Sequence, residues 1–209
     1  MSDSLRDRVL LEALAEVPGC GYSDAVLGRA AERAGLTKRE ILDTFPRGAQ
    51  SLVEAFSHWA DARMAETLAS DSSERLRERV RNAVKARIEA LIPYKDAARR
   101  ATAFLALPQY APLAARLTMR SVDQMWRAAG DRSSDFSYYT KRGLLAGVYG
   151  TTLMYWLSDS SEGNAATWDF LGHRIDNVMQ IEKFRGAAKD AISKLPNPLD
   201  LLASLRGRW

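Results

Sequence analysis

The fold of this chain is decided between Ser121 and Asp159, where the sequence reads SVDQMWRAAGDRSSDFSYYTKRGLLAGVYGTTLMYWLSD. This stretch contains two of the five tryptophans and four of the seven tyrosines, and the polar break GDRSSD occupies residues 130–135. We predict two helices that are joined at this break. Asp135 is the expected N-cap of the second helix, because its carboxylate can accept a hydrogen bond from a backbone N–H that lacks a partner within the helix.

The second helix contains a nearly apolar run from Gly143 to Leu157 that has no charged residue. A helix that is apolar most of the way round must be buried on most of its faces, and this run is too short to cross a bilayer. Its three glycines each cost roughly 1 kcal/mol relative to alanine. We therefore expect another helix or a ligand to approach closely there. Two interpretations stay open: packing within the core or a dimer, and a cavity for an apolar ligand.

The composition of the 209 residues favours helices throughout. The chain is 46% hydrophobic and 27% charged, which allows a sizeable core and argues against disorder. The single cysteine, Cys20, excludes an intramolecular disulfide. The sequence contains only two histidines, His58 and His173, and it has no metal-binding motif, P-loop or nucleophile motif. We therefore predict a protein that is not an enzyme and has no metal site.

Residues 1–70 are predicted to form a head of three short helices and the start of a longer one. The segment AGLTKREILDTFP at residues 34–46 resembles the helix-turn-helix of TetR-type proteins. Lys38 and Arg39 are offset there by Glu40 and Asp43, and residues 1–70 contain 8 Lys and Arg against 11 Asp and Glu. Because affinity for DNA comes mainly from neutralised phosphates, we expect a retained scaffold and not a DNA reader.

The rest of the chain is predicted to form a helical body, residues 71–195, and a C-terminal segment, residues 196–209. The helix from Arg75 to Leu91 has strongly basic faces, which are either solvated or attracted to anionic lipid headgroups. The C-terminal segment follows a Pro-Asn-Pro hinge and predicts a short amphipathic helix that either contacts a membrane interface or docks on its own core. The residues expected to contact the membrane are Leu201, Leu202, Leu205, Arg206 and Trp209.

A series of motifs extends from about Asp123 to Ile175. In order, they are Asp123-Gln-Met-Trp126, Ala129-Gly-Asp131, Asp135-Phe-Ser-Tyr-Tyr-Thr-Lys-Arg142, Val148-Tyr149, Asp159-Ser-Ser161 and Trp168-Asp-Phe-Leu171 with Arg174. Their order and spacing resemble the accessory protein family of coenzyme Q (ubiquinone) biosynthesis that partners the demethoxyubiquinone hydroxylase. The chain departs from that pattern at Tyr138, where relatives often carry Trp, and at Gly172-His173, where they usually have a more polar pair.

The resemblance implies an all-α, TetR-like fold that dimerises through the last two long helices of the body. It also implies a lipid-binding accessory protein that presents a quinone intermediate to the hydroxylase, with a bound isoprenoid or other lipid and no further cofactor. The patch that binds the hydroxylase is expected at Asp123, Met125, Tyr138, Tyr139 and Arg142. From the helical faces, the lipid tunnel is expected to be lined by Phe104, Leu107, Met119, Trp126, Leu145, Val148 and Trp156.

The N-terminus is charged and lacks the apolar core of a signal peptide. We therefore expect a protein of the bacterial cytoplasm that is peripheral on the inner membrane. The alternative is a mature chain from which a targeting peptide has been removed. Two other functions stay open: a TetR-type regulator that senses an apolar ligand and uses Lys38 and Arg39 on DNA, and a structural interaction protein without lipid.

Overall fold

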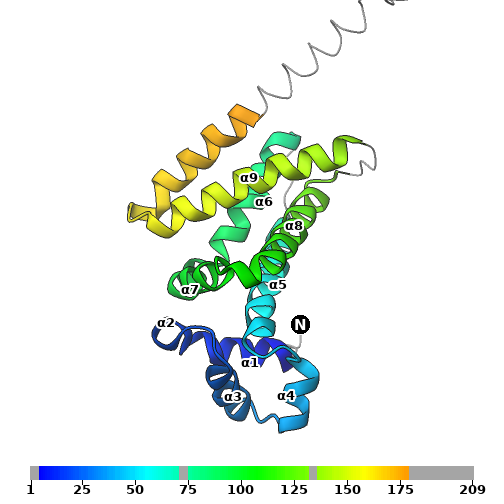
Figure 1. Cartoon of the computed structure of the whole chain (residues 1–209). Coiled ribbons are helices and arrows are strands. Elements are labelled where there is room, and N and C mark those ends of the chain that lie inside the picture. Colours follow the sequence, from blue (N-terminus) through cyan, green and yellow to red (C-terminus); the bar gives the residue numbers. More distant parts are fainter. Residues whose placement is uncertain (1–4, 71–74, 132–135, 179–209) are drawn as a thin grey trace, which may run out of the picture. The chain divides into compact units, whose positions relative to one another are not determined.

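The computed structural model describes residues 5–70, 75–131 and 136–178, and every regular element in these residues is a helix (Figure 1). This confirms the predicted all-α class. The chain divides into two compact units, residues 1–171 and 172–209, and the description below concerns the first of them. The helical head and the part of the body up to residue 171 lie within this unit, and one long helix belongs to both.

The head consists of α1 (Leu5–Leu14), α2 (Val17–Cys20), α3 (Asp24–Arg33) and α4 (Lys38–Thr44). The one-turn helix α2 was not predicted, although a proline in its first turn favours helix initiation. The turn between α3 and α4 contains Gly35 at φ +77°, and Thr37 begins α4 with a capping box: Glu40 N donates to the Thr37 hydroxyl, and Thr37 N donates to the Glu40 carboxylate. The predicted helix-turn-helix-like arrangement is therefore formed.

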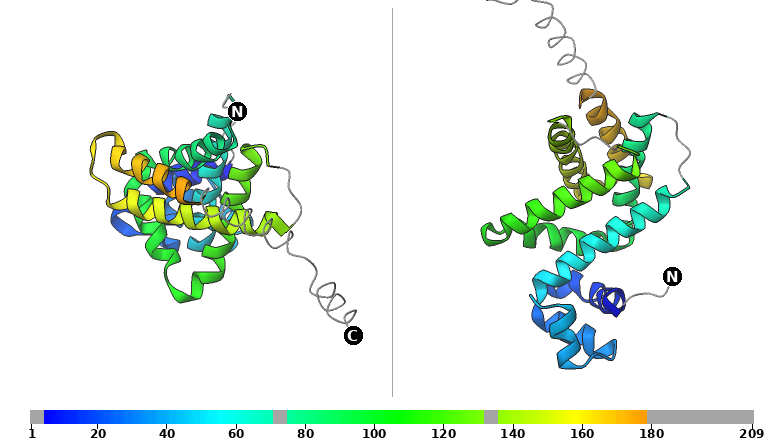
Figure 2. Two further views of the ribbon diagram at one scale, coloured as in Figure 1. Left: turned by 90° about the horizontal axis from the view of Figure 1, so that it is seen from above. Right: turned by 90° about the vertical axis from the view of Figure 1, so that its right-hand side faces the viewer.

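The long helix α5 (Ala49–Leu68) connects the head to the body (Figure 2). It packs against α1 and α3 in the head and against α6 (Leu76–Glu89) and α8 (Ala111–Ala128) in the body. Its buried side chains include Leu52, Val53, Phe56 and Met64, so they occupy several sides of the helix. The position of α5 between two groups of helices explains this burial on several faces.

The body continues from α6 through η1 (Ile92–Tyr94), α7 (Lys95–Leu105) and η2 (Pro108–Tyr110) to α8 and α9 (Phe136–Ser158). The predicted pair of helices joined at residues 130–135 is confirmed, with Gly130 at φ +83° directly after α8. Asp135, the expected N-cap, lies outside the described residues. After η3 (Glu162–Asn164) the chain is helical again at residues 165–178. None of the described helices is long and apolar enough to cross a membrane.

The structure corrects the expected burial of α9. One side of this helix is buried at Leu145, Val148, Tyr149, Thr152 and Trp156. The other side is exposed, and its residues are Gly143, Gly147, Thr151, Met154 and Tyr155. A Cβ added at any of the three glycines of the run would meet no described atom within 4 Å. The expectation of burial on most faces is therefore wrong for the described chain, since composition alone does not show how many neighbours a helix has.

The buried arginine Arg142 holds α8, α9 and the connecting break together. Its Nε and Nη2 donate to Oδ1 of Asp123 on α8 at 2.9 and 2.7 Å, and its Nη1 lies 3.7 Å from Oδ2 of Asp131 in the break. The side chain of Arg142 is only 4% exposed. A buried charge in this position depends on its partners, because it has left the water that would otherwise solvate it.

We predict that Arg142→Ala lowers the free energy of unfolding by about 3 kcal/mol, because Asp123 loses both hydrogen bonds of a buried guanidinium, while Asp131 keeps Lys141 at 3.1 Å. Arg127→Ala is the matched control: Arg127 binds Asp123 at 2.7 Å, but its side chain is 67% exposed. The control should cost less than about 1 kcal/mol. Urea unfolding followed by circular dichroism measures both variants, and equal losses would contradict the role given to Arg142.

Candidate functional site

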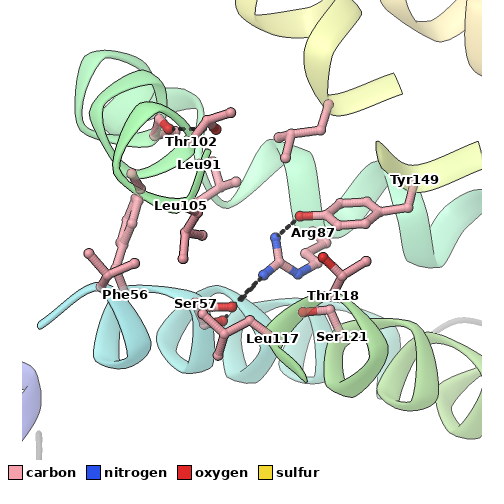
Figure 3. A pocket seen from close by; sticks show the side chains of 14 residues that line it. Phe56, Ser57, Arg87, Leu91, Thr102, Leu105, Leu117, Thr118, Ser121 and Tyr149 are labelled. Atoms are coloured by element: carbon pink, nitrogen blue, oxygen red, sulfur yellow. Dashed lines mark hydrogen bonds between the residues drawn. The ribbon is translucent and has the colours of Figure 1, made fainter. Parts of the chain in front are cut away.

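A cavity of about 100 Å³ lies inside the body, between α5, α6, α7, α8 and α9 (Figure 3). Most of its lining is apolar, and small side chains of α7 leave the space. The apolar residues are Val53, Phe56, Leu91, Ala98, Ala101, Leu105, Leu117 and Leu153. The polar residues are Ser57, Arg87, Thr102, Thr118, Ser121 and Tyr149. An apolar cavity with a few convergent polar groups is the usual form of a small-molecule site.

The polar end of the cavity is organised by Arg87 of α6. Its Nε donates to Oδ1 of Asp61 at 2.7 Å, and its Nη2 donates to the Ser57 hydroxyl at 3.1 Å. Its Nη1 donates to the Tyr149 hydroxyl, as Figure 3 shows. The Arg87 and Asp61 side chains are each only 5% exposed. The guanidinium is thus neutralised by Asp61 and bonded on three of its sides.

The charged groups at the polar end of the cavity are paired with each other, so the polar groups that a ligand would meet there are hydroxyls. Burial lowers the pKa of Arg87, but Tyr149 and Asp61 raise it, and the net shift is upward, so the guanidinium keeps its charge. Burial raises the pKa of the Tyr149 phenol, so this group keeps its proton at neutral pH. Because the Tyr149 oxygen already accepts from Arg87, its own O–H is available as a donor. Among the described atoms, the Ser121 hydroxyl is buried and has no hydrogen-bond partner.

This arrangement suits a neutral ligand that combines an apolar body with an oxygen acceptor. Tyr149 can donate to such an oxygen, and Ser121 can donate or accept. A cavity of about 100 Å³ is smaller than the ~150 Å³ apolar cavity that binds benzene in an engineered protein. In the conformation described, the cavity is therefore smaller than a benzene site, so a quinone ring could enter only if the surrounding helices moved apart, and an isoprenoid tail is not enclosed.

The predicted lipid-binding residues lie elsewhere in the body, and none of the seven lines this cavity. Leu145, Val148 and Trp156 are buried in the core, whereas Leu107 and Met119 are exposed. The Phe104 ring stacks on Tyr110 at 4.2 Å, and Trp126 donates its Nε1–H to the backbone oxygen of Lys141 at 3.3 Å. The predicted residues fill the core, lie on the surface or pack against other side chains, and the cavity lies beside a different set of residues that includes Ala98 and Ala101.

The sequence did not identify Arg87, Ser121 and Tyr149 as site residues. Each of them did carry a signal, because each is a polar group on an otherwise buried helical face. Arg87 lies beside the buried Val84 and Ile88 of α6. A polar side chain within an apolar stripe is a better indication of a cavity than the large apolar residues around it.

The predicted hydroxylase-binding residues separate into surface and interior. Tyr139 is 72% exposed, whereas Met125 is fully buried and Arg142 is held in the interior by Asp123. Met125 and Arg142 are therefore not available for direct contact with a partner in the conformation described. The side chain of Tyr138 and the five membrane-contact residues between Leu201 and Trp209 lie outside the described residues. Among the residues that the structure describes, no group of His, Cys, Asp or Glu could hold a metal ion.

Comparison with curated proteins identifies consistent relatives. Residues 111–182 match the COQ9 family model. The chain is 34% identical over 187 residues to "Ubiquinone biosynthesis protein COQ9, mitochondrial" of Drosophila melanogaster. This alignment covers 86% of this chain and 57% of the relative. The proteins of the same name from Rattus norvegicus and Homo sapiens are 32% and 31% identical over 188 residues, with 86% of this chain and 60% and 59% of each relative covered. The chain thus spans about three fifths of the length of these relatives.

These matches confirm the predicted resemblance to a ubiquinone biosynthesis family, but they correct the predicted localisation. The relatives are named as mitochondrial proteins and come from eukaryotes, which contradicts a location in the bacterial cytoplasm and on its inner membrane. The expectation of the bacterial cytoplasm depended on the charged N-terminus, and the expectation of membrane contact depended on the C-terminal segment.

Among solved structures, the TetR transcriptional regulator from Nitrosomonas europaea ATCC 19718 is similar with a TM-score of 0.66, over 83% of this chain and 97% of that chain. The two sequences are 22% identical. This similarity confirms the TetR-like fold and shows the fold alone.

We predict that Tyr149→Phe lowers the free energy of unfolding by about 1–3 kcal/mol, because Arg87 loses a buried hydrogen-bond partner. Tyr155→Phe is the control: Tyr155 is also on α9, but it lies on the exposed side, so the expected change is within about 0.5 kcal/mol. Urea unfolding of the two variants measures the difference. If both variants unfold at the wild-type midpoint, the Tyr149 hydroxyl is not part of the buried network.

Proposed function

Residues 111–182 of this chain match the COQ9 family model, and from that premise we propose that the chain is a lipid-binding accessory protein and not an enzyme. In this role it holds a quinone intermediate and presents it to the demethoxyubiquinone hydroxylase. The observation that carries the proposal is the apolar cavity with one neutral polar end. A quinone ring is apolar on its faces and has oxygen acceptors at its edge, which matches this lining.

The geometry supports a specific orientation of the ring. Its faces contact the apolar walls, including Ala98, Ala101 and Leu117, and an oxygen accepts from Tyr149 or Ser121. The isoprenoid tail is not enclosed at the present volume, so it leaves between the helices that surround the cavity.

The exposed side of α9 supports a homodimer as part of the same proposal. A Cβ at Gly143, Gly147 or Gly150 would meet no atom of the described residues within 4 Å, and small residues allow two helices to approach closely. Met154 and Tyr155 add apolar and aromatic surface to this side of the helix. Peripheral contact with a lipid surface through residues 196–209 completes the proposal, and these residues lie outside the described part of the chain.

The exposed tyrosine Tyr139 gives a test of the proposed hydroxylase contact. Exposed aromatic side chains are frequent hot spots of protein interfaces, so Tyr139→Ala should weaken binding of the hydroxylase by about tenfold or more. Leu42→Ala in the head is the control, because Leu42 is similarly exposed, at 68%. Isothermal titration calorimetry with the purified hydroxylase measures the affinities, and circular dichroism confirms the fold. Wild-type affinity in a folded Tyr139→Ala variant would rule out the contact.

The cavity gives a separate test of the lipid function in cells. In a strain that lacks this chain, we expect ubiquinone to fall and its demethoxy precursor to accumulate, measured by extraction and mass spectrometry. Wild-type protein should restore ubiquinone. Ala101→Phe should not, because Ala101 lines the cavity and a benzyl group fills it.

Ala103→Phe is the matched control, because Ala103 lies on the same helix but is exposed. It should restore ubiquinone like the wild type. Thermal melting of both purified variants shows whether each is folded, so a loss of function in a folded Ala101→Phe variant can be assigned to the filled cavity. An unchanged quinone pool in the strain without the chain would refute the function itself, and full restoration by Ala101→Phe would refute the role of the cavity.

A further inference from the structure

A second cavity, of about 290 Å³, is lined by other residues of α5 and α8 than the first cavity, apart from Leu117. Its lining also differs in chemistry. Its six lining residues are Arg47, Glu54, His58, Arg116, Leu117 and Arg120. Arg47 lies in the head just before α5, Glu54 and His58 lie on α5, and the other residues lie on α8. Three guanidiniums and an imidazole therefore surround one carboxylate, which makes the cavity strongly basic.

The three arginines that line this cavity have N–H groups that do not donate to a carboxylate of the described residues. Nη2 of Arg47 and Nη2 of Arg116 both donate to Oε1 of Glu54, each at 2.6 Å. A guanidinium has five N–H groups, and within the described residues Nε and Nη1 of these two arginines donate to nothing. Nε of Arg120 lies 3.7 Å from Oδ2 of Asp61, which is beyond hydrogen-bond distance. Asp61 is itself neutralised by Arg87, so the cluster around the cavity keeps a net positive charge.

His58 adds a group whose charge depends on pH. Burial lowers the pKa of the imidazole, as do Arg120 of α8 and Arg6 of α1, while Asp61 and Glu54 on α5 oppose the shift. Arg47 and Arg116 line the same cavity and add to its positive charge. His58 is therefore neutral at pH 7. A bound anion would favour the protonated form of the His58 imidazole. The anion should therefore bind more strongly at lower pH, where His58 is more readily protonated.

We propose that this cavity binds a small phosphate-class anion, either free or as the phosphate of a lipid headgroup, through Arg47, Arg116 and Arg120. Guanidinium groups suit this ligand because their N–H pairs match the spacing of phosphate oxygens. Arg47 belongs to the head and Arg116 and Arg120 to the body, so the bound anion would connect the two. The site stands independently of the quinone cavity, which has a neutral polar end.

The first experiment titrates the full-length protein with inorganic phosphate at pH 7.5, by calorimetry and at constant ionic strength set with chloride. We expect saturable binding of one phosphate. Arg120→Gln should weaken it about tenfold or more, because a charge-assisted hydrogen bond is lost without disturbing Glu54. Arg127→Gln on the same helix is the control and should bind like the wild type, since Arg127 does not line the cavity. Absence of saturable binding, or equal affinities of the two variants, would overturn the proposal.

Two further arms test His58 and the source of the anion. Sulfate keeps its charge between pH 6 and 8, so its affinity should rise as the pH falls in the wild type and stay constant in His58→Gln. A rise that persists in His58→Gln would overturn the role of His58. Vesicles of phosphatidic acid, compared with phosphatidylcholine vesicles, separate a lipid headgroup from a free anion. Sedimentation that Arg120→Gln weakens supports the headgroup as the source, and sedimentation that Arg120→Gln leaves unchanged overturns it.

Discussion

The buried ion pair between Arg87 and Asp61 is the interaction on which the body of this protein depends. It joins α6 to α5, and through the Tyr149 hydroxyl it joins both to α9. A charge at this depth is tolerated only when its partners are all in place, and removal of one partner of such a pair typically costs about 3–5 kcal/mol. The pair therefore fixes the relative rotation of three helices. The cavity owes its polar end to this constraint, since the same contacts hold Tyr149 in place.

Two buried carboxylates of α5 also connect this helix to α8 and to the head. Glu54 and Asp61 are two turns apart, so they lie on the same side of α5, and both are buried. Arg116 and Arg120 are four residues apart on α8 and face Glu54 and Asp61 respectively. Arg47 adds a contact from the head to Glu54. One helix thus carries two buried acids that organise five basic side chains, counting Arg87 and His58. The two cavities share the wall that these contacts build, and Leu117 lines both.

The sequence predicted the local features of the fold well, because short-range physics determines them. The polar break at residues 130–135 and the helix-turn-helix-like head are both visible in neighbouring residues. The burial of α9 and the lining of the cavity depend on which neighbours each helix meets and at what rotation. Large apolar side chains such as Trp156 indicated a tunnel but fill the core, while the space is bordered by Ala98 and Ala101. Arg87 gave a usable signal, since a charge in an apolar stripe requires buried partners.

The two cavities differ in the ligand that their donors can accept, and this difference follows from how their arginines are satisfied. Arg87 has a buried carboxylate and two hydroxyl oxygens as partners, so it presents no spare charge to the first cavity. A ligand there meets hydroxyl groups, and neutral hydrogen bonds contribute only about 0.5–1.5 kcal/mol each. Such weak contacts favour a neutral molecule that exchanges readily, as the proposed presentation to the hydroxylase would require. In the second cavity the guanidiniums keep unused donors, and the charge-assisted bonds that these can form are roughly twice as strong. An anion is the ligand that satisfies them.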